Sequence, residues 1–88
     1  MYQIQKVTDR DGFIKQDEAY KRRTGSIGGI RRLQLYYPMI IEYKKDNQGN
    51  TKTGYLQTSV VIKIDCNSED NSYIVTTTNS IYYLKSTD

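Results

Sequence analysis

The sequence predicts one small, mostly β domain over residues 1–88, folded as an antiparallel barrel of about five to six short strands. Runs rich in Tyr, Ile, Val and Thr recur at spacings of roughly ten residues, and polar or glycine-containing turns separate them. A chain of 88 residues supports one hydrophobic core. A barrel is favoured over a sandwich because so short a chain cannot build two large sheets, and because a barrel leaves no long free edges.

The first third of the chain contains one clear strand and two ambiguous segments. Residues 2–7 alternate apolar and polar side chains, which is typical of a half-buried strand, and residues 9–12 supply a turn. Residues 13–23 fit neither a helical stripe nor a clean alternation, so a strand and one helical turn both remain open. Three glycines within residues 24–29 mark either a loop or a bulged, sharply bent strand.

Two alternating runs occupy residues 30–43, and a proline separates them. Pro38 is expected to stop or bend the first run because proline cannot donate a hydrogen bond to a central ladder. The polar residues 46–54 then predict a solvated, mobile hairpin loop. The side chains expected to share a face are Leu33, Leu35 and Tyr37 in the first run, and Met39, Ile41 and Tyr43 in the second.

The strongest strand pattern of the chain lies at residues 55–65. Its alternation places Val60, Ile62 and Ile64 on one face, and we expect these three residues in the core. A polar connection at residues 66–72 follows this strand.

The C-terminal part of the chain predicts a β-hairpin. Two β-rich runs, residues 73–78 and 81–85, are separated by Asn79 and Ser80 only. This is the spacing of a two-residue hairpin turn, in which Asn79 is expected to adopt a positive φ.

Residues that commonly support catalysis or metal binding are scarce. Cys66 is the only cysteine and histidine is absent, which argues against disulfides, zinc sites and the Cys-His pairing of thiol enzymes. The glycine-rich residues 24–29 lack the Gly-Lys-Ser/Thr ending of a phosphate-binding loop. The carboxylates of residues 65–70 are expected to be solvated. We therefore expect no enzymatic activity, no cofactor and no metal.

The hydropathy pattern predicts a soluble, cytoplasmic protein without a membrane partner. Residues 1–10 alternate instead of forming the apolar run of a signal peptide. The longest apolar stretches, residues 38–41 and 60–62, are far shorter than the roughly 20 residues of a membrane span.

Positive charge is concentrated in the middle of the chain. Residues 15–45 hold eight basic and three acidic side chains, whereas residues 46–88 hold three basic and five acidic ones. Folding back at the glycines would bring cations from both sides together near Tyr20, Tyr36, Tyr37 and Tyr43, as phosphate contacts and base stacking require. The basic residues of this predicted nucleic-acid site are Lys21, Arg22, Arg23, Arg31, Arg32, Lys44 and Lys45. Alternatively, the charges form a solvated face and the tyrosines are ordinary barrel residues.

Two short motifs in the second half of the chain suggest a family. They are Thr58-Ser59-Val60 within residues 54–61, and Asn79-Ser80-Ile81-Tyr82 within residues 76–82. Over residues 38–85 the chain resembles small uncharacterised accessory proteins of phages and conjugative elements of Gram-positive bacteria. The resemblance implies a mobile-element accessory protein with an SH3-like barrel, and it implies no catalytic residue.

These observations lead to two expectations for function. The first is a non-enzymatic binding module that contacts nucleic acid through its basic edge. The second is a protein-interaction module, for example a mobile-element inhibitor or adaptor that docks on a host protein through a tyrosine-rich or strand-edge surface.

Overall fold

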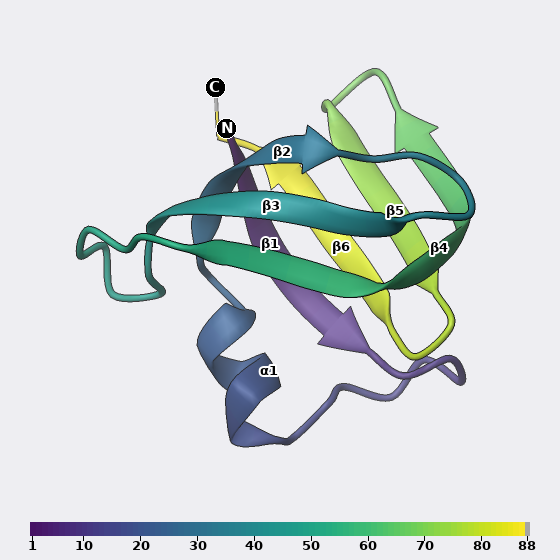
Figure 1. Cartoon of the computed structure of the whole chain (residues 1–88), viewed down its shortest axis with the longest axis horizontal. Coiled ribbons are helices and arrows are strands. Elements are labelled where there is room, and N and C mark those ends of the chain that lie inside the picture. Colours follow the sequence, from purple (N-terminus) through teal and green to yellow (C-terminus); the bar gives the residue numbers. More distant parts are fainter. Residues whose placement is uncertain (88) are drawn as a thin grey trace.

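In the computed structural model, which describes residues 1–87, six antiparallel strands form one closed sheet with one short helix beside it (Figure 1). Each strand pairs with the next along the chain, and the last strand pairs with the first. The predicted mostly β fold is therefore confirmed, while residue 88 of the expected domain lies outside the described residues. The elements are β1 (Tyr2–Thr8), α1 (Glu18–Arg23), β2 (Ile27–Arg32), β3 (Pro38–Lys45), β4 (Tyr55–Asn67), β5 (Ser72–Thr77) and β6 (Ile81–Ser86).

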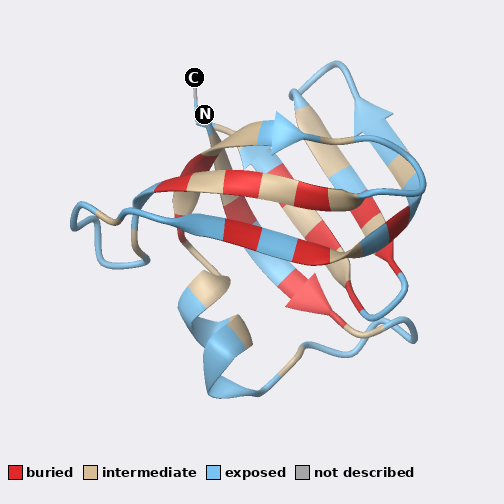
Figure 2. Cartoon of the chain, in the orientation of Figure 1, coloured by how far each residue is buried: buried red, intermediate tan, exposed pale blue. Residues whose placement is uncertain are grey.

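The apolar side chains that point into the closed sheet form one core. Buried and less buried positions alternate along β3 (Figure 2), so the shared face predicted for Met39, Ile41 and Tyr43 is confirmed. The buried apolar residues are Ile4, Val7, Met39, Ile41, Tyr43, Leu56, Val61, Val75, Tyr82 and Leu84.

The predicted core face of β4 is wrong. Val61 is fully buried, whereas Val60 and Ile62 are each 37 % exposed and Ile64 is only partly buried. The buried positions before Val61 are Leu56 and Thr58.

Register shifts on both sides of β4 explain this reversal. One shift lies between the pairs Pro38/Val60 and Ile40/Gln57, where β4 pairs with β3. Another begins at Val61, where β4 pairs with β5. A bulge inserts an extra residue and so moves every following side chain to the opposite face, which a strict alternation of two cannot predict.

This register predicts that Val61, and not its neighbour, stabilises the fold. Val61→Ala removes two buried methyl groups and should lower the free energy of unfolding by about 2 kcal/mol. Ile62→Ala is the matched control and should cost less than about 1 kcal/mol, because its side chain already contacts solvent. Urea unfolding followed by circular dichroism measures both values, and a larger loss for Ile62→Ala would contradict the register.

The strand expected at residues 30–37 begins and ends earlier than predicted. β2 starts at Ile27 and has a register shift between Ile27 and Gly28, so residues 27–29 belong to a bulged strand and not to a loop. It ends at Arg32, and the following residues leave the sheet with Leu35 41 % and Tyr37 50 % exposed. Tyr36 has a φ of 72°, outside the range of regular β-strand backbone, and Pro38 opens β3 instead of closing the preceding strand.

Gly28 allows β2 to approach β3 closely. A Cβ atom at this position would overlap the Glu42 carbonyl oxygen and lie 2.7 Å from Cγ2 of Ile41. At Gly29, by contrast, the nearest such contact is the Met1 sulfur at 4.0 Å. The first glycine is therefore required by packing between the strands and the second is not.

Alanine substitutions distinguish these two glycines. Gly28→Ala should lower the free energy of unfolding by about 1–3 kcal/mol, because the backbone of β3 must move. Gly29→Ala should be neutral or stabilise by up to about 1 kcal/mol through the reduced entropy of the unfolded chain. Thermal unfolding of both variants tests this, and equal losses would argue against the close β2–β3 approach.

Residues 18–23 form the helical turn that the sequence left open as one of two alternatives.

The turn between β5 and β6 differs from the prediction. Asn79 does not adopt a positive φ, since among residues 1–87 the non-glycine residues that do so are Tyr36 and Asn71. The β5–β6 connection is instead held by Thr77, whose hydroxyl donates to the Ser80 carbonyl at 2.9 Å and accepts the Ser80 N–H at 3.0 Å.

Candidate nucleic-acid interface

The seven predicted basic residues lie at three places in the fold. Three are in α1, two end β2 and two end β3. Because β2 and β3 are antiparallel, Lys45 lies opposite Ile27, the first residue of β2 and close in sequence to α1. Arg32 lies at the far end of this extended strand, about 17 Å away at roughly 3.3 Å per residue.

The glycines therefore do not bring the cations on either side of them together. Gly28 and Gly29 belong to β2, where the chain is extended. The expected fold-back is wrong because both glycines continue the extended strand β2, where Gly28 allows the close approach to β3. The basic residues instead divide into an α1 group with Lys45, and a second group on the sheet.

Arg23 has a structural role at the end of the closed sheet. Its Nη1 donates a hydrogen bond of 2.9 Å to the Tyr82 hydroxyl, and its guanidinium lies 4.6 Å from the centre of the Tyr20 ring. Tyr82 is only 2 % exposed, and burial raises its pKa to about 12, so the hydroxyl stays protonated and accepts from Arg23. Interaction with the Ser80 hydroxyl lowers the pKa of Tyr20, which contacts the core from α1. Arg23 is thus used internally and is a poor phosphate contact.

Neighbouring arginines of α1 should differ in their effect on stability. Arg23→Met leaves the buried Tyr82 hydroxyl without its donor and should cost about 1–3 kcal/mol. Arg22→Met is the control, since Arg22 is exposed, and its effect should stay within about 0.5 kcal/mol. Chemical unfolding of both variants gives the comparison, and similar values would show that Arg23 does not secure α1.

The second group of cations lies on the outer face of β2, β3 and β4. Arg31 is 3.6 Å from the Glu42 carboxylate, and Lys44 is 3.5 Å from its other oxygen. Glu42 is paired across the sheet with Tyr55, which is 64 % exposed. We call this surface the basic aromatic face, and it comprises Arg31, Arg32, Tyr37, Glu42, Lys44 and Tyr55.

A bulge places both arginines of β2 on this face. The pairing shifts between Ile30 and Arg32, so Arg31 and Arg32 share one partner position beside Ile40. Both arginines are exposed. The Arg32 guanidinium lies 5.4 Å from the centre of the Tyr37 ring, which is a cation–π distance. Three cations and one carboxylate leave this face with a net charge of +2.

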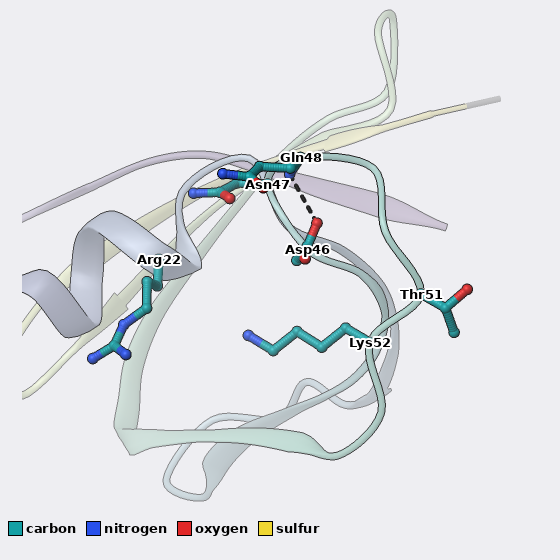
Figure 3. A pocket seen from close by; sticks show the side chains of 6 residues that line it. All are labelled: Arg22, Asp46, Asn47, Gln48, Thr51 and Lys52. Atoms are coloured by element: carbon teal, nitrogen blue, oxygen red, sulfur yellow. Dashed lines mark hydrogen bonds between the residues drawn. The ribbon is translucent and has the colours of Figure 1, made fainter.

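A hollow of about 440 Å³ lies between α1 and the loop after β3 (Figure 3), and Lys52 of its lining donates its backbone N–H to the Lys44 carbonyl at 3.0 Å. Lys52 extends across it toward Arg22, and its ammonium lies 3.9 Å from the centre of the Tyr43 ring. Asp46 organises the loop, since its carboxylate accepts the backbone N–H groups of Gln48 and Asn50 at 2.9 Å each, and these bonds lower its pKa. The lining residues are Arg22, Asp46, Asn47, Gln48, Thr51 and Lys52.

Sequence reasoning missed Tyr55 and Glu42 of the basic aromatic face, and two of the tyrosines that it placed beside the cations lie in or against the core. Tyr55 begins a strand and Glu42 is acidic, so neither gave a signal. Tyr43 is buried, and Tyr20 packs against the core. Exposure therefore separates the tyrosines in a way that their spacing does not.

Comparisons with protein-family models, with curated proteins and with solved structures found no match to this chain. Within residues 1–87 no helix has the length and apolar character needed to cross a membrane. The same residues contain no cluster of three or more His, Cys, Asp or Glu side chains suited to a metal ion. The surface geometry of the basic aromatic face is the feature from which a function can be inferred.

Proposed function

We propose that the protein is a non-enzymatic binding module that contacts nucleic acid through the basic aromatic face. The observation that supports this proposal is the placement of Arg31, Arg32 and Lys44 beside the exposed rings of Tyr37 and Tyr55. Guanidinium and ammonium groups neutralise phosphates, and this electrostatic contact provides most of the affinity of sequence-independent binding. An SH3-like chain path and a mobile-element origin belong to the same proposal, supported by the sequence motifs alone.

The ion pairs on this face leave its cations available to a phosphate. Arg31 and Lys44 are 63 % and 48 % exposed in their side chains, and exposed pairs contribute about 0–1 kcal/mol. A phosphate can therefore replace Glu42 as their partner at little cost. Lys21, Arg22 and Lys45 are exposed and form no ion pair within residues 1–87, so they extend the positive surface toward α1.

Salt dependence of binding tests the proposed function. Anisotropy titrations of labelled single-stranded and duplex oligonucleotides at several salt concentrations should show binding that weakens steeply with salt. Combining Arg31→Ala, Arg32→Ala and Lys44→Ala should reduce the magnitude of the log-log slope by about three, because each of these cations neutralises one phosphate.

The control for this experiment removes the same charge elsewhere. Arg10, Lys63 and Lys85 are exposed and lie outside the face, so changing these three to Ala should leave the slope nearly unchanged. Absence of binding at low salt, or equal slopes for the two triple variants, would contradict the proposal.

A second candidate function is supported by apolar side chains on the outside of β4 and β5. Val60, Ile62 and Ile74 are each 37 % exposed, and the exposed Tyr36 is bonded through its N–H to the Val61 carbonyl between the first two. Exposed apolar clusters often mark protein contacts. A protein-interaction module that docks on a host protein would use this surface. It would retain its partner after nuclease treatment and lose it in an Ile62→Asp variant, with the basic face intact.

A further inference from the structure

We propose that the ligand of the basic aromatic face is a single-stranded nucleic acid, with unpaired bases stacked on Tyr37 and Tyr55. This inference rests on the proposed function and adds the class of ligand. Phosphate contacts alone serve duplex and single strand alike. The exposed rings distinguish the two, because bases inside a duplex stack on each other and present only their edges in the grooves.

The rings of this face are not used by the core. Tyr55 is 64 % exposed, Tyr37 is 50 % exposed, and neither belongs to the apolar cluster inside the sheet. Tyr36, next to Tyr37, is 75 % exposed. Base–aromatic stacking requires such open ring faces next to cations that follow the phosphate backbone. The Arg32 guanidinium beside Tyr37 provides that combination in one contact.

The loop that carries Tyr36 and Tyr37 is fixed in place on β4. The Tyr36 N–H donates to the Val61 carbonyl at 2.8 Å, and the Val61 N–H donates to the Tyr37 carbonyl at 3.0 Å. Tyr36 adopts a φ of 72°, a left-handed conformation that is strained for a non-glycine residue. Because the backbone of this loop is already fixed, the loop loses less conformational entropy when a base stacks on it than a flexible loop would.

The strand register sets the distance between the two stacking positions. Tyr37 immediately precedes Pro38, and Tyr55 is paired with Glu42, so about five residues of β3 separate the two levels. At roughly 3.3 Å per residue this separation is about 17 Å. A single strand laid along β3 would cover about four or more nucleotides, within the range of single-strand-binding barrels. Arg31 and Arg32 lie between the two rings along this path.

The test compares labelled oligothymidylate, oligouridylate and a DNA hairpin of matched length by fluorescence anisotropy. The wild-type protein should bind the single strands at least about tenfold more tightly than the hairpin. Tyr55→Leu and Tyr37→Leu should each weaken single-strand binding by about fivefold or more, with the salt slope unchanged because no charge is removed. Tyr55→Trp should restore binding, since it returns a stacking surface.

A matched control separates stacking from general effects of removing a tyrosine. Tyr83 lies on the outer face of β6 under the Lys6 ammonium, 4.4 Å from its ring centre, so Tyr83→Leu should not change affinity. Equal binding of hairpin and single strands, with no effect of the Tyr37 and Tyr55 variants, would overturn this inference and leave the proposed function standing. Absence of salt-dependent binding in the wild type would overturn the proposed function itself.

Discussion

The register shifts of β4 determine how the rest of this protein is arranged. Up to Val60 the strand pairs with β3, and from Val61 onward it pairs with β5. One long strand therefore belongs to both halves of the sheet, and its bend allows the six-stranded sheet to close. Bulges increase the twist of a strand and bend it, which a small closed sheet requires.

The same bend connects the core to the proposed binding surface. Val61 points into the core, while its backbone N–H and carbonyl hold the loop at Tyr36 and Tyr37. On this side of β4 the neighbouring strand β3 begins only at Pro38, so the Val61 N–H and carbonyl bond the loop that precedes β3. The left-handed conformation of Tyr36 is part of this loop. The exposed Tyr36 and Tyr37 are therefore held in place by β4 itself, and no additional helix or strand is needed to position them.

The sequence predicted the parts of the fold that local patterns determine, namely β1, β3, β4, β5 and β6 and the core face of β3. The face of Val60 and Ile62 was mispredicted because a bulge is set by pairing with two neighbouring strands, which no local window contains. The grouping of the basic residues failed at Gly28 for a similar reason. A glycine required by a turn cannot be distinguished in sequence from a glycine required where two strands approach closely, because in both places a side chain would not fit. Here the constraint is the Glu42 carbonyl on the neighbouring strand.

Helix α1 links stability and charge at the other end of the sheet. Six residues are too few for a stable isolated helix, and Asp17 makes no side-chain capping bond at its start. The helix is held instead by contacts with the sheet, through Arg23 to Tyr82 and through Tyr20 to the core. Lys21 and Arg22 are carried on the same turn, so their position depends on a hydrogen bond to a buried tyrosine. The positive surface near α1 is therefore ordered by the core, although its side chains are exposed to solvent.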